Sequence, residues 1–162
     1  MNGLDLSQLK ALVVTPTLQQ LALIIPALGN SWAINQVTGT ALVESGCVYL
    51  KQLGGGPALG LFQMEPATHD DCWTNFLTFN SALKARVQNI AGQASPTATL
   101  MVTNLAYAAA MARIKYWRSP LASPAATDAA GCAAYHKAVY NSALGAADAG
   151  ANTPLFQQAI AA

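Results

Sequence analysis

The chain has 162 residues, enough for one globular domain with a buried core that needs no metal ion or disulfide to hold it. Hydrophobic residues make up 53% of the chain and charged residues only 9%, which excludes a disordered protein and indicates a compact helical one. The net charge is +1, from 8 basic and 7 acidic residues, and Lys and Arg never form a run, so the sequence does not predict nucleic-acid binding.

The predicted helices follow the apolar periodicity and the helix-capping residues of the chain. In chain order they cover residues 5–13, 17–28, 32–45, 66–77, 81–90, 97–117 and 128–141, and a last short helix opens at residues 153–154. Pro16 predicts a break between the first two helices, and Gly46 is placed to end the third. The helix over residues 97–117 is apolar on most faces and is expected at the centre of the domain.

The region between the third and fourth predicted helices has a different character. Residues 48–50 are predicted as a short strand, residues 54–57 as a turn, and residues 59–63 as either a short strand or an irregular packed segment. The sequence therefore predicts a single domain over residues 1–162 that is mainly α, with at most a small β-sheet or an irregular β region.

The most apolar N-terminal stretch, residues 21–28, is too short to span a bilayer. The residues before it match a signal peptide poorly. We therefore expect a chain made in the cytosol, without its own export signal and without stable membrane insertion.

The chain has three cysteines, Cys47, Cys72 and Cys132. Their number is odd and no two have CxxC spacing, a pattern that is typical of small buried thiols. A single disulfide stays open if the protein ends its life in the periplasm. Neither His69 nor His136 has the spacing of a metal site, and we expect neither a metal nor another cofactor.

Only two glutamates are present, Glu44 and Glu65. Glu44 continues a stripe formed by Ala33, Val37 and Ala41, one turn before the end of its predicted helix. A carboxyl on that mostly apolar face is expected to be partly desolvated, as a general acid that keeps its proton near neutral pH requires. The alternative is a glutamate that bends out to water.

Glu65 precedes Pro66 at a predicted helix start, where a negative charge is favoured by the helix dipole. It is also a candidate second carboxylate facing Glu44. Asp70 and Asp71 compete for that role, or are solvated charges near the start of the same helix.

Several motifs resemble those of lytic transglycosylases related to goose-type lysozyme. They are Ala-Leu-Val-Glu-Ser-Gly at residues 41–46, Gly-Leu-Phe-Gln at 60–63, Pro-Ala-Thr at 66–68, Asn-Leu at 104–105 and Val-Tyr-Asn at 139–141. The order of these motifs is specific, and the stretch from residue 133 to the trailing Leu-Gly-Ala-Ala at 144–147 looks most like bacteriophage members. The resemblance covers residues 32–147.

The resemblance implies a lysozyme-like fold and an enzyme that cuts peptidoglycan glycan strands between N-acetylmuramic acid and N-acetylglucosamine. Glu44 would be the general acid. Ser45, Gln63, Tyr140 and Asn141 would position the acid or the sugar, with Glu65 in support. A monomeric phage endolysin or virion enzyme, made in the host cytoplasm and reaching the periplasmic wall through a holin pore, fits this interpretation.

Two departures from the family pattern keep alternatives open. Glu65 replaces a residue that is usually apolar, and Val139 stands where Ala is usual. The first allows a hydrolytic muramidase that uses Glu44 and a second carboxylate. A non-catalytic wall-binding or virion domain is the third interpretation. Trp73, Phe62 and Tyr107 are candidates for stacking on sugar rings or for core packing.

Overall fold

The computed structural model describes residues 3–141 and 148–162, and it confirms a mainly helical chain. Its α-helices are α1 (Leu6–Gln8), α2 (Thr15–Ala22), α3 (Ser31–Ser45), α4 (Pro66–Asn75), α5 (Ser81–Ala91), α6 (Leu100–Thr103), α7 (Leu105–Trp117), α8 (Ala129–Val139) and α9 (Ala149–Ala161). A π-helical segment covers Leu9–Val14, and short 3₁₀ turns cover Pro26–Gly29, Leu53–Gly55 and Leu77–Phe79. Within the described ranges, no helix combines the length and the apolar character needed to cross a bilayer.

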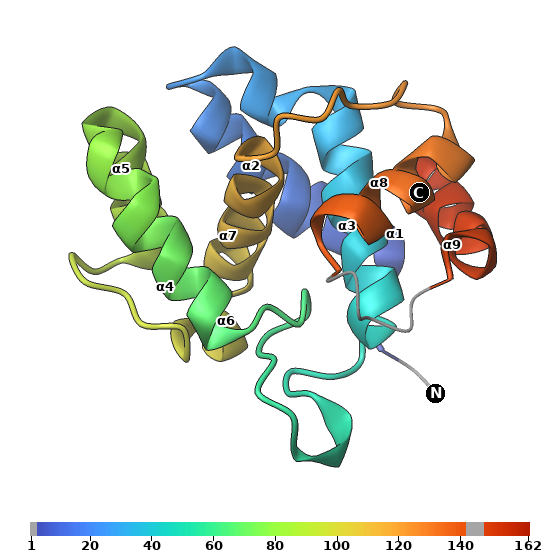
Figure 1. Cartoon of the computed structure of the whole chain (residues 1–162), viewed down its shortest axis with the longest axis horizontal. Coiled ribbons are helices and arrows are strands. Elements are labelled where there is room, and N and C mark those ends of the chain that lie inside the picture. The colour runs from blue at the N-terminus through green and yellow to red at the C-terminus, as the bar shows by residue number, and fades with distance from the viewer. Residues whose placement is uncertain (1–2, 142–147) are drawn as a thin grey trace.

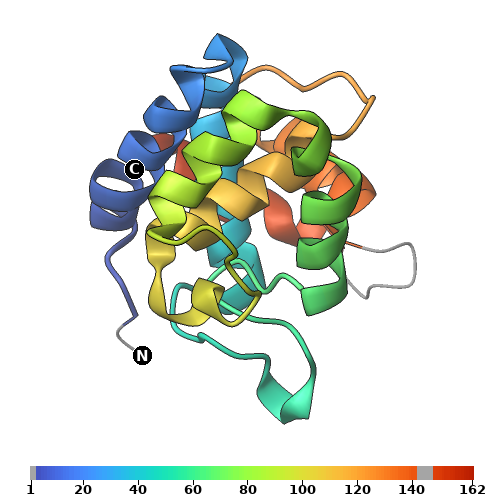
Figure 2. The same ribbon diagram turned by 90° about the vertical axis from the view of Figure 1, so that its left-hand side faces the viewer.

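Helix α7 is the centre of the domain, as its apolar sequence predicts. Every residue from Tyr107 to Ile114 is buried, and small alanines fill much of that stretch, so neighbouring helices approach it closely. Helices α4 and α5 cover one side of α7 and α3 packs on another (Figures 1 and 2). Helix α9 packs against both α3 and α8 near the C-terminus.

The expected break at Pro16 is wrong, because the helical path continues from Leu6 to Ala22. The turn before the proline widens to a π-helix, in which the Thr15 N–H donates to the carbonyl of Lys10, five residues back. Pro16 follows this wider turn directly in α2, and the wider turn accommodates the proline within the continuous helical path.

The helix predicted over residues 97–117 is divided by Asn104, whose backbone is extended at φ −118° and ψ 96°. The Asn104 side chain accepts a hydrogen bond from the Tyr107 N–H and so caps α7. Its Nδ2 group donates to the carbonyl of Ile90 at the end of α5.

The C-terminal helix also differs from the prediction, which placed its start at residues 153–154. Helix α9 begins at Ala149 after the N-cap Asp148, so Pro154 lies inside it. The Asp148 carboxylate accepts a hydrogen bond from the Gly150 N–H, and this cap sets the start of the helix.

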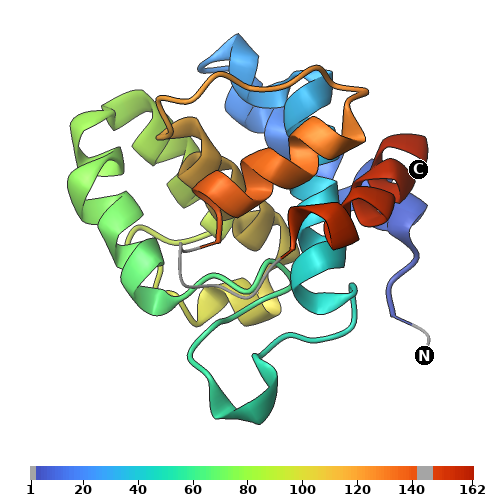
Figure 3. The same ribbon diagram turned by 45° about the vertical axis from the view of Figure 1, so that its right-hand side comes forward.

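The segment between α3 and α4 forms an arm below the helices (Figures 1 and 3). The predicted strand at residues 48–50 is absent, and the arm contains only the isolated bridges Lys51–Leu59 and Leu59–Met64 among its described residues. Residues 59–63 are therefore the irregular packed segment that the sequence allowed.

A buried polar chain joins α4 to α7. The Trp73 indole N–H donates to the Tyr107 hydroxyl at 2.9 Å, and this hydroxyl lies 2.6 Å from Nε2 of His69, whose Nδ1 lies 2.8 Å from Asp70 Oδ1. The Tyr107 hydroxyl accepts from the indole and can itself donate to His69 Nε2, and in that tautomer the Nδ1–H of the imidazole faces the Asp70 carboxylate. These side-chain contacts fix the position of α4, which carries one wall of the candidate active site.

Candidate active site

Glu44 lies in the last turn of α3, where the sequence placed it. Gly46 ends the helix in the left-handed conformation, with φ 59° and ψ 21°, as predicted. The Glu44 side chain is 20% exposed, so its carboxyl is half-buried and still reachable from solvent.

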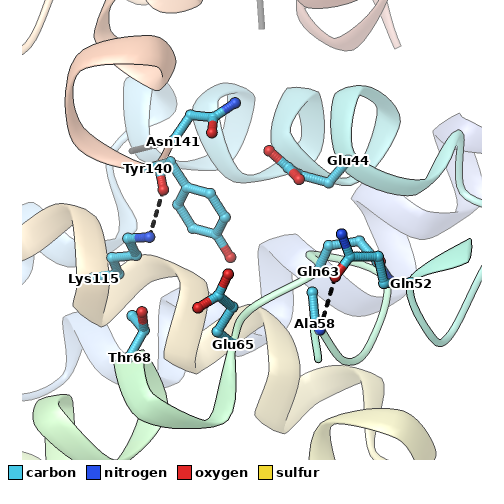
Figure 4. A pocket seen from close by; sticks show the side chains of 9 residues that line it. All are labelled: Glu44, Gln52, Ala58, Gln63, Glu65, Thr68, Lys115, Tyr140 and Asn141. Carbon is cyan, nitrogen blue, oxygen red and sulfur yellow. Dashed lines mark hydrogen bonds between the residues drawn. The ribbon is translucent and has the colours of Figure 1, made fainter. Parts of the chain in front are cut away.

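Glu44 opens onto a pocket of about 270 Å³ between α3, the arm and the start of α4. The lining residues are Glu44, Gln52, Ala58, Gln63, Glu65, Thr68, Lys115, Tyr140 and Asn141. Figure 4 shows Glu44 and Glu65 on opposite sides of this pocket, both with their carboxyls turned into it. A second hollow of about 430 Å³, which includes Ser45 and Tyr49, shares Glu44, Gln52 and Gln63 with the first, so the two adjoin at Glu44.

Gln63 is held in a tight turn with a positive φ of 45°. Its backbone N–H and its side-chain Nε2 both donate to the carbonyl of Gly60, at 3.1 and 2.7 Å. Gly60 has a φ of 72°, and a Cβ at this position would lie 2.5 Å from the backbone oxygen of Met101. The glycine therefore allows the arm to lie directly against α6, which sets where Gln63 meets the pocket.

Tyr140, which is distant in sequence, anchors the same turn. Its hydroxyl donates to the Phe62 carbonyl at 2.8 Å, and burial raises the pKa of this phenol well above its usual value. The hydroxyl thus contacts the backbone of the arm, while the Tyr140 ring lines the pocket.

Removing the Tyr140 hydroxyl should loosen this anchor. Tyr140→Phe leaves the buried Phe62 carbonyl without its donor, and we expect a loss of about 1–3 kcal/mol in the free energy of unfolding. Any reaction in the pocket should slow as well, because Gln63 follows Phe62 directly. Urea unfolding and activity measurements separate the two effects.

Tyr135→Phe is the matched control for that change. The Tyr135 hydroxyl also donates to a backbone carbonyl, that of Leu121 at 3.2 Å, but Tyr135 does not line the Glu44 pocket. Equal activity losses in the two variants would contradict an anchoring role for Tyr140.

Two further residues belong to the site and were not predicted. Nε2 of His136 lies 2.9 Å from Oε1 of Glu44, and the imidazole is fully buried. Lys115 donates to the Tyr140 carbonyl, and its ammonium lies 4.3 Å from the centre of the Tyr140 ring. Burial lowers the Lys115 pKa, and the carboxylates Glu44 and Glu65 oppose this shift.

The three candidates for a second carboxylate facing Glu44 have different surroundings. Glu65 is the N-cap residue of α4, but its side chain makes no capping hydrogen bond and lines the pocket instead. Asp71 pairs with Arg118 at 2.6 Å, and Asp70 contacts His69. Neither aspartate lines the Glu44 pocket.

The remaining predicted site residues occupy different positions. Ser45 is buried and donates to the Ala41 carbonyl one turn back, so its hydroxyl is engaged within α3. Asn141 lines the pocket beside Tyr140. The motif at residues 144–147 lies outside the described residues.

The aromatic residues considered for sugar stacking are mainly core residues. Phe62 and Tyr107 are buried, while Trp73 is half-buried and donates a hydrogen bond to the Tyr107 hydroxyl. The three cysteines are unpaired and buried. In the described part of the chain, no cluster of three or more His, Cys, Asp or Glu residues is arranged to hold a metal ion.

The site therefore combines a half-buried carboxyl, a second carboxylate, an ammonium group and several amides in one open polar pocket. Such a set can donate a proton to a bound oxygen atom and can hydrogen-bond hydroxyl and acetamido groups. Comparisons of the chain with protein-family models, curated proteins and solved structures give no match.

Proposed function

We propose that this chain is a peptidoglycan-cleaving enzyme with a lysozyme-like fold, in which Glu44 is the general acid. The observation that carries the proposal is the half-buried Glu44 carboxyl at the junction of two adjoining hollows. A polymer lying through both would have a bond between two sugar units beside Glu44. The motif resemblance supports the same residue independently.

In the proposed reaction, the Glu44 proton passes to the oxygen that joins N-acetylmuramic acid to N-acetylglucosamine. The bond from that oxygen to C1 of the muramic acid breaks and the electron pair stays on the oxygen. The 6-hydroxyl oxygen of the same muramic acid then bonds to C1, assisted by the acetamido group, and its proton returns to Glu44. The product is an anhydro sugar, and no enzyme nucleophile is needed.

The hydrolytic alternative uses the same acid with water as the nucleophile. Glu65 is then the base, and the two carboxyls of an inverting enzyme stand about 6.5–9.5 Å apart to admit that water. Digestion of purified peptidoglycan followed by mass spectrometry tests the proposal, because the anhydro and reducing products differ by one water. A wild-type chain that releases neither product would refute the enzymatic function and leave a wall-binding role.

We expect Glu65→Gln to lower turnover modestly, by about tenfold or less, with the product unchanged. Glu65 makes no helix-capping hydrogen bond, so it is free to stabilise the positive charge that develops on the sugar ring. The loss of helix-dipole stabilisation should be at most about 1 kcal/mol. Steady-state kinetics and product masses measure both effects.

Asp70→Asn is the control for Glu65→Gln, since Asp70 lies in the adjacent helix α4 but outside the pocket, and the amide oxygen of Asn can still contact His69. Near-complete loss of turnover in folded Glu65→Gln, together with reducing-end products from the wild type, would make Glu65 the base of a true lysozyme.

As part of the same proposal, the chain is a phage protein made in the host cytoplasm. It would reach the wall through a pore supplied by another protein.

A further inference from the structure

His136 is a buried polar residue whose ring nitrogens lie among groups that offer them few polar contacts. Its ring is stacked on Tyr140, with centres 5.5 Å apart and planes 18° apart, and is packed against Phe156 at 5.8 Å. Its side chain is fully buried. Among residues 3–141 and 148–162, neither ring nitrogen has a hydrogen-bond partner. Burying an imidazole in this way is costly unless another polar interaction compensates it.

The compensating group is Glu44. Nε2 of His136 and Oε1 of Glu44 are 2.9 Å apart, an ion-pair distance without the alignment of a hydrogen bond. Two bare lone pairs at this separation would repel each other, so at least one of the two atoms carries a proton. That proton lies either on Nε2 of the imidazole or on Oε1 of the carboxyl.

The two placements differ in what they leave buried. With the proton on Oε1, a neutral imidazole carries its own proton on Nδ1, where a buried N–H has no described acceptor. With the proton on Nε2, its N–H lies 2.9 Å from a carboxyl oxygen, and the lone pair on Nδ1 is the group left without that polar contact. Unsatisfied buried acceptors are the more tolerable of the two, which favours the proton on Nε2.

We infer that His136 is a positioning residue for Glu44, with its Nε2–H against Oε1. This inference rests on the proposed function. It leaves Oε2 as the oxygen that carries the transferable proton into the pocket. When that proton passes to the glycosidic oxygen, Glu44 becomes a carboxylate, and the imidazole N–H stabilises the new charge at Oε1. The contact is therefore strongest when the proton has left, so it should act mainly on kcat.

The kinetic test compares two substitutions of His136. His136→Phe keeps a ring but removes the N–H, and we expect kcat for glycan cleavage to fall roughly 10- to 100-fold with KM little changed. His136→Gln places an amide N–H at the same number of bonds from the backbone as Nε2, and it should recover most of the lost kcat.

Phe156→Leu is the matched packing control, because Phe156 touches the His136 ring but lies outside the pocket. It should lower stability and leave kcat unchanged. Wild-type kcat in folded His136→Phe, a loss confined to KM, or equal losses in the Phe and Gln variants would each overturn the inference.

A second measurement needs no activity. Long-range ¹H–¹⁵N spectra of the wild-type chain should show His136 protonated on Nε2, with signals that move in Glu44→Gln and stay in place in Glu65→Gln. Protonation on Nδ1, or signals insensitive to Glu44→Gln, would overturn the pairing. If the wild type releases no product from peptidoglycan, the proposed function fails, and these spectra still decide whether His136 and Glu44 are paired.

Discussion

Glu44→Gln is expected to lower the rate of glycan cleavage by about two to four powers of ten, which is the usual contribution of a general acid. The amide has nearly the shape of the carboxyl but carries no proton that it can transfer to the glycosidic oxygen. Rates should be measured by product release from purified peptidoglycan, because clearing of a suspension is too coarse to follow four powers of ten.

The fold should survive the same substitution. The amide oxygen of the substituted side chain can still face Nε2 of His136, and the position remains partly open to solvent. Exchanging a half-buried carboxyl for a neutral amide also removes part of a desolvation cost. We therefore expect an unchanged circular dichroism spectrum and an equal or slightly higher melting temperature. A folded Glu44→Gln variant that cleaves at the wild-type rate would remove Glu44 from the mechanism.

The two ends of α3 were readable from the sequence, whereas the capped starts of α7 and α9 were not. Asn30 caps α3 by accepting a hydrogen bond from the Ala33 N–H, and Gly46 ends that helix. These contacts lie within three or four residues of the helix end, so residue type alone is a good guide.

The prolines were less reliable guides. Pro16 predicted a break and Pro154 a helix start, yet helical structure runs through both. A wider turn accommodates the first, and an upstream cap at Asp148 fixes the start of the second helix. The sequence pattern of a proline does not reveal whether the preceding turn widens or whether a stronger cap lies upstream.

The predicted pocket residues Glu44, Gln63, Glu65, Tyr140 and Asn141 do come together, although they lie on three separate parts of the chain. Glu44 and Glu65 were first singled out as the only two glutamates, whereas Gln63, Tyr140 and Asn141 were identified through motif resemblance.

His136 and Lys115 were missed because each reaches the site through packing between distant helices. One local signal was present: His136 precedes Tyr140 by four residues, so both occupy one face of α8 and its end. That spacing would have placed His136 beside the Tyr140 of the motif, but the contact with Glu44 depends on how α8 packs near α3.

Gly60→Ala is expected to destabilise the fold strongly through the backbone of the arm. The left-handed conformation at φ 72° costs an alanine about 1–2 kcal/mol. The new Cβ would also lie 2.5 Å from the Met101 backbone oxygen, a contact that only movement of the arm or of α6 can relieve. Overpacking of this kind adds about 1–3 kcal/mol, so we expect a total loss of about 2–5 kcal/mol in the free energy of unfolding.

Gly92→Ala separates the two contributions. Gly92 has the same φ of 72°, but a Cβ there would meet no atom within 4 Å. It should therefore show only the backbone penalty, measured by urea unfolding in parallel with Gly60→Ala. The rate of glycan cleavage should fall in Gly60→Ala and not in Gly92→Ala. The Gly60 carbonyl accepts hydrogen bonds from both the backbone N–H and the side chain of Gln63, so a shift of Gly60 moves Gln63. Equal destabilisation in the two variants would mean that the approach of the arm to α6 is not tight, and that Gly60 serves the turn alone.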